Sequence, residues 1–451
     1  MKSKHYDVFV IGSGIAGQTV AKLCSENGLS VAISDNRAFG GTCANRGCDP
    51  KKILLQFSDL AHKSNQLTGL GIKKAPKISW KDVQSFKKKF TKKIPKGTEN
   101  SLSDLGISMY HQSPKFIANN KVEVEGKHVT ADYFVIATGK IPRPLNIEGH
   151  KFLKVSDDVL NLKKVPKSAI FIGAGYIGLE FAYMLSVLGC KVTILQKDSE
   201  ALSQFDSFLV EKLVKSLKTK GVEFIFNVDV KSIEKLKKNF KVNYDSEGTL
   251  KSIKSRQVFN TSGRIPAIEE LDLSLASIEA NDTGVEVDFY LQSTTNPLVY
   301  ACGDVSSKSL PLTPLSGLQG YIVAHNIIKE KSKKFENPLV PSNVFTQPNL
   351  ASVGYSESEA KKRYKNIKIY QGDVSHWFNA KKSNEDAYAY KILVNERTDE
   401  IVGAHILSPE ANETINILTL AINNKITVSA LKKHIFTYPS YTNDLKTMLK
   451  D

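Results

Sequence analysis

Two cysteines, Cys43 and Cys48, lie five residues apart in the glycine-rich segment GGTCANRGCDPKK. A regular helix would place them on different faces, so a bond between them needs a distorted turn, which the glycines permit. A helical pattern follows from Ile53 to Leu60, and the N-terminus of a helix stabilises a thiolate. The spacing does not fit a zinc knuckle, and no second Cys or His pair lies nearby. The segment therefore predicts a redox-active thiol pair and no metal site.

The other three cysteines are Cys24, Cys190 and Cys302, which stand alone in apolar or glycine-rich surroundings. Five cysteines in a chain of this size are not a disulfide framework. We interpret these three as packed thiols.

A thiol pair of this kind needs an electron source, and the N-terminal segment predicts a unit that binds one. A strand from Asp7 to Ile11 leads into the turn GSGIAG, a helix from about Gln18 to Asn27 and a second strand from Leu29 to Ser34. This order of strand, glycine turn, helix and strand is the dinucleotide-binding fingerprint.

Four residues give the fingerprint its chemistry. Gly12 permits the sharp turn, Gly14 lets the backbone approach a pyrophosphate, and Gly17 allows close helix–strand packing. Asp35 follows the second strand, where a carboxylate binds ribose hydroxyls. The helix N-terminus adds free N–H groups for the phosphates.

The same unit recurs. Its strands run from Ser168 to Ile172 and from Lys191 to Leu195, with a helical pattern from Leu179 to Leu188 between them. The turn residues expected to bind cofactor are Gly173, Gly175, Tyr176, Ile177 and Gly178. Two fingerprints imply two dinucleotides, and FAD with NAD(P)H is the natural pair because hydride passes readily between them.

The second unit ends in Gln196 and Lys197 where a carboxylate would otherwise stand. A carboxylate favours a free 2′-hydroxyl, whereas a cation tolerates a 2′-phosphate. We therefore predict NADPH in preference to NADH. The alternative is that Lys197 is a solvated loop lysine.

Two further stretches fit a flavin domain. A strand from Tyr133 to Ile136 precedes Ala137-Thr138-Gly139, and a strand from Leu298 to Cys302 precedes Gly303 and Asp304. A carboxylate at the C-terminal end of a parallel strand is well placed to bind a polyol. The alternative for Asp304 is a helix N-cap.

Composition limits the remaining possibilities. The chain has 451 residues, too many for one hydrophobic core, and no apolar run is long enough to span a bilayer. The polar N-terminus, Met1 to Tyr6, lacks a signal-peptide pattern, so we expect a cytoplasmic protein without a membrane partner. The net charge of +16 is interpreted as a lysine-rich solvated surface, since no nucleic-acid motif accompanies it.

The cysteine segment resembles the GGTCxNxGCxPxK signature of the pyridine nucleotide-disulfide oxidoreductases, which include glutathione reductase, dihydrolipoamide dehydrogenase and mercuric reductase. The resemblance covers essentially the whole chain, through both fingerprints, TSGRIP (residues 261–266), ACGD (301–304) and LTP (312–314). It implies that Cys48 is the charge-transfer thiol beside the flavin and that Cys43 is the interchange thiol that attacks substrate.

The resemblance also implies roles for other positions. Lys52 matches the lysine near flavin N5, Glu180 its acidic partner, Tyr176 the residue that covers the flavin, and Asp304 the ligand of the ribityl chain. Further cofactor positions fall at Gly41, Thr42, Thr138, Gly139 and Gly263.

The fold that this implies is α/β, with two Rossmann-like domains and a C-terminal α/β dimerisation domain. An FAD domain (residues 1–147 and 265–335) is interrupted by an NAD(P) domain (148–264), and the interface domain follows (336–451). From about Pro338, strand-like runs alternate with helical ones, as a separate α/β domain requires. A homodimer is expected from the same resemblance.

The chain departs from the family near its C-terminus. Tyr438 stands where glutathione and lipoamide reductases carry a histidine, and Asn443 stands at the position of its glutamate. Tyrosine is a poor base at neutral pH and asparagine does not titrate. His434 replaces the histidine only if the backbone path differs. A tyrosine here resembles mercuric reductase, but the C-terminal cysteine pair of that enzyme is missing.

We therefore expect an FAD-dependent oxidoreductase that passes electrons from NADPH through flavin and the Cys43–Cys48 disulfide to a disulfide-type acceptor, either a small molecule or a small protein. One alternative keeps the dithiol but reduces a metal ion or a quinone. Another is a redox-sensing flavoprotein with slow turnover.

Overall fold

The computed structural model describes residues 4–450 and forms two compact units. The first unit comprises residues 1–53, 84–143 and 263–337, and the second comprises 54–83, 144–262 and 338–451. Residues 1–3 and 451, at the outer ends of the predicted first and last domains, lie outside the described residues.

The first unit is built on one large sheet with strand order β3-β2-β1-β6-β5-β4, and β18 also pairs with β6. The central strand β1 (Lys4–Ile11) pairs in parallel with β2 (Val31–Ser34) and β6 (Lys127–Ile136). The outer strands are β3 (Ser108–Tyr110), β4 (Lys115–Ala118), β5 (Lys121–Val124) and β18 (Val299–Ala301). The apolar run of β1 is buried, as expected of a parallel strand covered on both faces.

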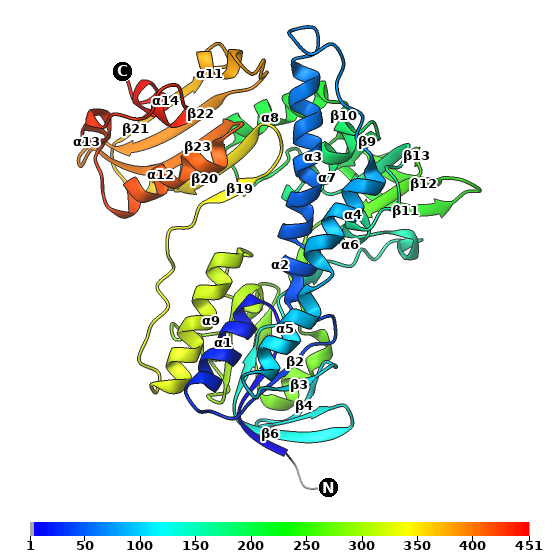
Figure 1. Ribbon diagram of the computed structural model, residues 1–451, viewed down its shortest axis with the longest axis vertical. Helices are drawn as coiled ribbons and strands as arrows, with labels where there is room; N and C mark the ends of the chain where they lie inside the picture. The colour runs from blue at the N-terminus through cyan, green and yellow to red at the C-terminus, as the bar shows by residue number, and fades with distance from the viewer. Residues whose placement is uncertain (1–3, 451) are drawn as a thin grey trace. The chain divides into compact units, whose positions relative to one another are not determined.

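Two helices of this unit, α1 (Ile15–Glu26) and α9 (Thr313–Ile328), pack side by side (Figure 1). Their approach is so close that a Cβ at Gly320 would lie 2.6 Å from the carbonyl oxygen of Ala16. Because β18 and α9 belong to the late part of the chain, the first unit is assembled from distant segments. The remaining elements are α2 (Gly41–Arg46), α5 (Ile94–Ser103), β7 (Lys140–Pro142), β15 (Arg264–Pro266), β16 (Ala280–Asn281) and β17 (Gly284–Val285).

The redox segment feeds a longer helix than its sequence pattern predicts. The helix α3 runs from Cys48 to Gln66, whereas the apolar pattern indicated only Ile53 to Leu60. Pro50 falls in the first turn, where a proline does not interrupt helical hydrogen bonding. The helix therefore starts at the second redox cysteine itself.

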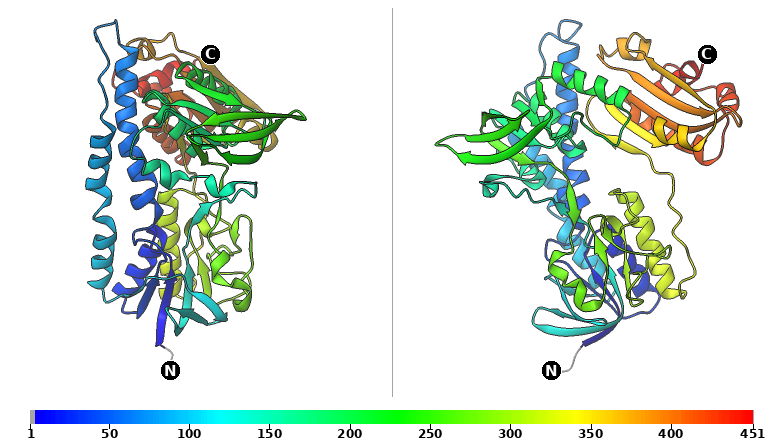
Figure 2. Two further views of the ribbon diagram at one scale, coloured as in Figure 1. Left: turned by 90° about the vertical axis from the view of Figure 1, so that its right-hand side faces the viewer. Right: turned by 180° about the vertical axis from the view of Figure 1, so that it is seen from behind.

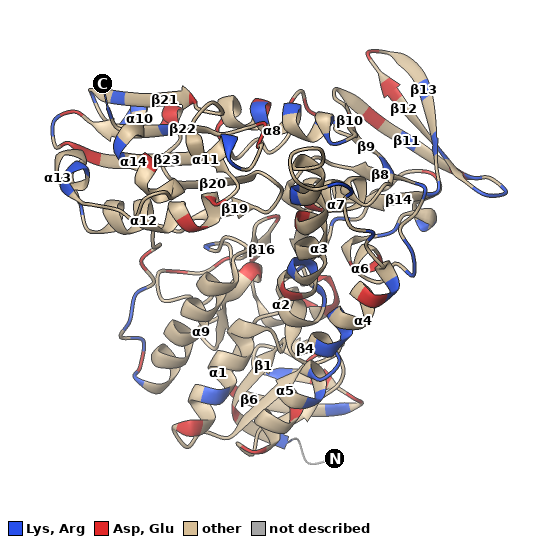
Figure 3. Ribbon diagram, turned by 45° about the horizontal axis from the view of Figure 1, so that its top comes forward, with Lys and Arg blue, Asp and Glu red and all other residues tan. Residues whose placement is uncertain are grey.

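A second helix, α4 (Trp80–Thr91), follows α3, and its segment is strongly basic. Residues 73–96 contain ten lysines and one acidic residue, and nine of these lysines are exposed. In Figure 3 the ribbon is coloured blue at Lys and Arg positions along α4. Much of the positive charge of the chain is thus held on one solvated segment.

The second unit contains a parallel sheet of order β10-β9-β8-β14. The strands β8 (Ser168–Ile172) and β9 (Lys191–Leu195) coincide with the predicted strands, and α7 (Tyr176–Val187) lies between them in sequence. The other elements are α6 (Ser156–Leu160), α8 (Ser207–Thr219), β10 (Val222–Ile225) and β14 (Gln257–Asn260). An antiparallel meander of β11 (Val228–Lys235), β12 (Phe240–Ser246) and β13 (Thr249–Ser255), which the sequence did not predict, projects beside this sheet (Figure 2).

The C-terminal part of the second unit is an antiparallel sheet of order β19-β20-β23-β22-β21. Its strands are β19 (Ser342–Val344), β20 (Asn349–Gly354), β21 (Ile367–Asp373), β22 (Ala389–Asn395) and β23 (Glu400–Ser408). Its helices are α10 (Glu357–Arg363), α11 (Phe378–Lys381), α12 (Ala411–Asn423), α13 (Val428–Lys433) and α14 (Tyr441–Met448). The predicted alternation of strands and helices after Pro338 is confirmed.

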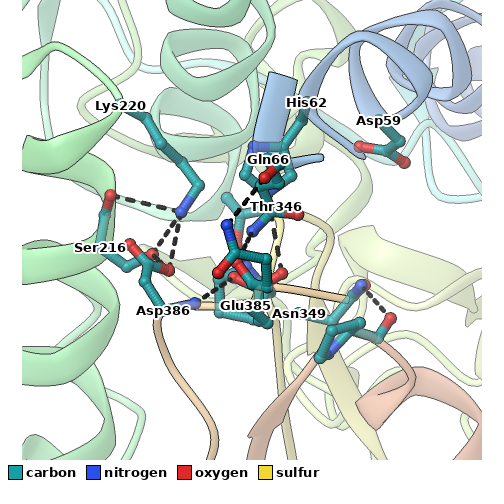
Figure 4. A network of polar contacts seen from close by, with 12 residues as sticks. Asp59, His62, Gln66, Ser216, Lys220, Thr346, Asn349, Glu385 and Asp386 are labelled. Atoms are coloured by element: carbon teal, nitrogen blue, oxygen red, sulfur yellow. Dashed lines mark hydrogen bonds and ion pairs between the residues drawn. The ribbon is translucent and has the colours of Figure 1, made fainter. Parts of the chain in front are cut away.

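A polar network fastens this sheet to α8 and α3 (Figure 4). The Lys220 ammonium lies 3.1 Å from Asp386, which also accepts hydrogen bonds from Ser216 and Thr219. On the neighbouring residue, the carboxylate of Glu385 lies 3.7 Å from His62 of α3. Because most of these side chains are shielded from water, their hydrogen bonds and ion pairs favour one arrangement of the sheet, α8 and α3 within the second unit.

Candidate active site

The two predicted redox cysteines lie on either side of a helix break. Cys43 belongs to α2, which ends at Arg46, and Cys48 begins α3. A Cβ at the intervening Gly47 would lie 2.8 Å from the carbonyl oxygen of Thr42, so only glycine lets the chain turn this tightly. This is the distorted turn that the spacing demanded, and it brings the two thiols within hydrogen-bonding distance. Both are free thiols here, with Cys43 half-buried and Cys48 exposed.

The surroundings of the two thiols shift their pKa values in opposite directions. The hydrogen bond from Cys43 lowers the pKa of Cys48 to about 6, against the opposing effect of partial desolvation of its sulfur by the surrounding chain. Lys51, Thr313 and Lys52 lower the pKa further. The same hydrogen bond, with burial, raises the pKa of Cys43. At neutral pH the reduced pair therefore holds one thiolate on Cys48 and one proton on Cys43.

Two residues of this site were missed by the sequence reasoning. Lys51 is 7% exposed and acts on Cys48 more strongly than Lys52, the lysine predicted for the site. Thr313, in the first turn of α9, hydrogen-bonds both thiols. The Lys51-Lys52 doublet and the Thr-Pro sequence at the start of a helix were the available signals.

The first fingerprint forms an anion-binding cradle at the start of α1. Gly14 is the N-cap, and no side chain caps the helix, so its first N–H groups remain available for a phosphate. Gly41 (φ +69°) approaches Gly14 so closely that a Cβ would lie 2.4 Å from the Gly14 Cα. The Thr138 hydroxyl is buried and has no hydrogen-bond partner within residues 4–450. A buried hydroxyl without a partner is consistent with a bound group that supplies one.

Both predicted carboxylates of this unit are in place. Asp35 follows β2 and accepts hydrogen bonds from the Ser13 hydroxyl (2.6 Å) and the Ser13 N–H (2.9 Å). Asp304 follows β18 and accepts from the Ser316 hydroxyl at 3.2 Å. Burial raises the pKa of Asp304, while Arg264 lowers it. The predicted positions Gly12, Gly17, Thr42, Gly139 and Gly263 belong to the same unit.

The second fingerprint repeats the cradle at the start of α7. Gly175 is the N-cap without a side-chain cap, and Tyr176 beside it is 37% exposed. Gln196 is not a free ligand, because its amide oxygen accepts from the Ala174 N–H (2.7 Å) and its amide nitrogen donates to Asp198 (2.7 Å). The strand end thus holds an acid, Asp198, as well as the predicted Lys197. Gly173, Ile177 and Gly178 lie in this cradle as the fingerprint requires.

Glu180, also on α7, is one of two carboxylates in the second unit that the segment of residues 345–347 helps to hold; the other is Asp59. Glu180 is 1% exposed and accepts a hydrogen bond from the Phe345 N–H at 3.0 Å. One turn later, the Tyr183 hydroxyl donates to Asp59 at 2.8 Å, and the Gln347 side chain donates to the same carboxylate. Because Phe345 and Gln347 are two residues apart, one chain segment fixes both carboxylates.

Tyr438, which stands at the position of the family's histidine near the C-terminus, is exposed to solvent. The Tyr438 side chain is 71% exposed and stacks on Phe378, with ring centroids 6.5 Å apart. Asn379, the next residue, holds the segment by donating to the Ser440 carbonyl at 3.0 Å. Asn443 lies in the first turn of α14, and its backbone N–H donates to the Ser440 hydroxyl. His434 is a helix C-cap residue beside Phe436.

Comparison with protein families gives two matches. Residues 6–321 match the pyridine nucleotide-disulphide oxidoreductase family, and residues 340–449 match the dimerisation domain of the same family. The chain belongs to the pyridine nucleotide-disulphide oxidoreductases. The expectation drawn from the cysteine signature is therefore confirmed, as is the α/β fold class.

Known relatives of this oxidoreductase span several activities. It is 32% identical to glutathione reductase of Burkholderia cepacia over 99% of both chains. It is 30% identical to mercuric reductase of Bacillus cereus, covering 98% of this chain and 70% of the relative. In structure it is similar to a cysteine-to-serine mutant of the HOCl-induced flavoprotein disulfide reductase RclA from Escherichia coli in complex with Cu(II), with a TM-score of 0.87, 27% identity and 99% of both chains covered.

The cofactors of this family, FAD and NAD(P)H, are thereby confirmed for the oxidoreductase. The uncapped starts of α1 and α7, the Thr138 hydroxyl and the partly buried Asp304 carboxyl fit them. These groups offer N–H donors to phosphates and polar partners to a polyol. Within residues 4–450, no helix is long and apolar enough to cross a membrane and no group of three ligating side chains is arranged for a metal ion.

Proposed function

We propose that this oxidoreductase uses NADPH to reduce the Cys43–Cys48 disulfide and passes the electrons to a disulfide-type acceptor. The observation that carries the proposal is the pair of adjoining thiols at the start of α3, whose surroundings lower the pKa of Cys48 and raise that of Cys43. FAD, held at the cradle of α1, would supply the two-electron link between the hydride of NADPH and the disulfide.

The two thiols then carry out the exchange in two displacements. The Cys43 sulfur attacks one sulfur of the acceptor and releases one thiolate, while its proton moves to the neighbouring Cys48 thiolate. Cys48, after losing that proton to the departing thiolate, attacks Cys43 and releases the second half of the acceptor. The cysteines end as a disulfide, two electrons have left with two thiols, and the second proton comes from water.

This route assigns the first proton transfer to the thiol pair itself. It accounts for an exchange reaction without the histidine that Tyr438 replaces. Lys51, Lys52 and Thr313 support it by favouring the Cys48 thiolate. Glu180 keeps the role that the resemblance implies, as the acidic partner of Lys52, and its carboxylate accepts a hydrogen bond from the Phe345 N–H. Lys197 supports NADPH over NADH, although Asp198 stands in the same loop.

We also propose a homodimer, because the family's dimerisation domain makes up residues 340–449. In a dimer, the exposed Tyr438 and Phe378 would be covered by the partner subunit, with Tyr438 contributed to the partner's thiol site. The predicted domain boundaries, with the FAD domain at 1–147 and 265–335, the NAD(P) domain at 148–264 and the interface domain at 336–451, remain part of this proposal.

A second candidate acceptor is a metal ion or a quinone. Tyr438 and Asn443 supply no base for a disulfide, and the chain is similar both to mercuric reductase and to a copper(II)-bound disulfide reductase. Such acceptors need no general acid from the partner subunit.

Anaerobic titration with NADPH, and separately with NADH, tests the proposal. The expected result is two-electron reduction with a long-wavelength absorbance band from the Cys48 thiolate, which then discharges into a low-molecular-weight disulfide. Discharge only into metal salts or quinones would select the second candidate. Persistence of the band in Cys48→Ser would reject the assignment of Cys48.

A further inference from the structure

The dithiol carries a carboxylate of its own. Asp49 directly follows Cys48 and lies in the first turn of α3. Its Oδ1 atom is 3.9 Å from the Cys43 sulfur, within hydrogen-bonding reach of that thiol. The side chain is exposed to solvent, so its charge faces any molecule that approaches Cys43.

This carboxylate acts on the attacking sulfur, whereas the nearby lysines act on the other one. Lys51 and Lys52 favour the thiolate of Cys48. Asp49 opposes a negative charge on Cys43, in addition to the hydrogen bond and burial described above. An incoming anion must approach the same carboxylate, while a cation is attracted to it.

A simpler role for Asp49 is stabilisation of α3, since an acid in the first turn interacts favourably with the helix dipole. Asp82 occupies the corresponding place in α4 and is also exposed. No thiol contact of Asp82 occurs within the described part of the chain. Asp82 therefore offers a matched control for the helix-end role.

We propose that Asp49 determines acceptor specificity, so that Cys43 reacts with cationic and neutral acceptors in preference to anionic ones. This inference rests on the proposed function, since it concerns the acceptor of the same thiol pair. The acceptor class it favours is a disulfide with amino groups or no charge, rather than one with carboxylates.

The first test needs neither cofactor nor turnover. The reduced chain carrying Cys48→Ser, which removes the competing Cys48 thiolate, is alkylated with iodoacetate, an anion, and with iodoacetamide, its neutral counterpart. The rate at Cys43 is followed by mass spectrometry, with and without Asp49→Asn in the same background. Unit charges about 4 Å apart in water alter a rate by roughly fivefold. We expect Asp49→Asn to raise the iodoacetate-to-iodoacetamide rate ratio by about that factor at low salt, and the difference to shrink at roughly 1 M salt. Asp82→Asn should leave the ratio unchanged.

The second test uses three disulfides of differing charge with the flavin-loaded enzyme and NADPH. Cystamine is a dication, 2-hydroxyethyl disulfide is neutral and 3,3′-dithiodipropionate is a dianion. The wild type should prefer them in that order by kcat/KM, and Asp49→Asn should narrow the cystamine-to-dithiodipropionate ratio by at least roughly fivefold.

The two tests separate the inference from the proposed function. An unchanged alkylation ratio in Asp49→Asn would overturn the role of Asp49 even if all three disulfides are reduced. A shifted alkylation ratio with no disulfide turned over by the wild type would support Asp49 and overturn the disulfide-type acceptor.

Discussion

The replacement Tyr183→Phe tests the hydrogen bond that the Tyr183 hydroxyl donates to Asp59. In Tyr183→Phe, Asp59 loses the 2.8 Å hydrogen bond from Tyr183 and keeps only the donor from Gln347. A hydrogen bond to a charged group contributes about 1.5–3 kcal/mol. Because Tyr183 is fully buried and phenylalanine refills its volume, we expect a loss of about 2 kcal/mol in unfolding free energy with little change in packing.

The loss should depend on pH in a defined direction. Burial raises the pKa of Asp59, and the bonds from Tyr183 and Gln347 lower it, so Tyr183→Phe raises it further. A carboxyl whose folded pKa exceeds its unfolded value costs stability as the pH rises through the folded pKa. At pH values where Asp59 is protonated in both proteins, the unfolding free energy of the variant should therefore be close to that of the wild type. The full loss should appear at pH values above the folded-state pKa of Asp59 in both proteins.

Urea unfolding followed by tryptophan fluorescence measures this loss, since both tryptophans of the chain, Trp80 and Trp377, belong to the second unit. Tyr388→Phe is the matched control, because Tyr388 is also buried (1% exposed) and its hydroxyl also donates to a carboxylate, that of Asp444 at 3.0 Å, without contacting Asp59. A loss for Tyr183→Phe that does not depend on pH at any pH where both proteins are folded would refute the reasoning about Asp59. So would a loss below about 0.5 kcal/mol.

Three further predictions concern the thiol pair, the network of Figure 4 and the cofactor cradle. The thiolate absorbance of the reduced protein should appear with a midpoint near pH 6 for Cys48, and Cys43→Ala should move that midpoint upward; an unmoved midpoint would contradict the assigned hydrogen bond. Asp386→Asn should cost about 1–3 kcal/mol in urea unfolding, because it leaves the buried Lys220 without its carboxylate. Burial raises the pKa of Asp386, but Lys220 and its other partners hold it at about 2, so this contribution is present at neutral pH and is lost as the pH falls towards that value. Gly41→Ala should abolish retention of FAD during purification, because its Cβ would meet the backbone of Gly14; a variant that keeps stoichiometric flavin would contradict the cradle.

The sequence predicted the elements whose pattern is local. The strands at 168–172 and 191–195 were predicted to the residue because each is a short apolar run bounded on one side by a glycine, Gly173 after the first strand and Gly189 before the second. The meander β11–β13 was missed although β12 alternates apolar and polar residues, because β13 is mostly exposed and has no such alternation. Its identity depends on pairing between strands, which no single strand encodes.

The residues of the site also divide into those recognised from local sequence and those whose role depends on packing. Cys43 and Cys48 were recognised from spacing and glycines, which are local. Lys51 and Lys52 are equivalent in sequence, but adjacent residues on a helix point about 100° apart. Which lysine is buried was settled only once α3 was seen to begin at Cys48. Thr313 was noted only as part of the LTP motif, without a role, because only the packing of α9 brings it to the thiols.

The placement of sulfur in this chain also determines how it withstands oxidants. Burial raises the pKa of Cys24, Cys190 and Cys302 to about 12 in each case, so these thiols carry almost no thiolate at physiological pH. Oxidants such as peroxides consume thiolates, and the sulfinic and sulfonic products are generally not repaired. Oxidation is thus directed to the Cys48 thiolate, and the neighbouring Cys43 thiol can convert its sulfenic acid to a disulfide with loss of water before further oxidation. In the proposed function, NADPH then reduces that disulfide.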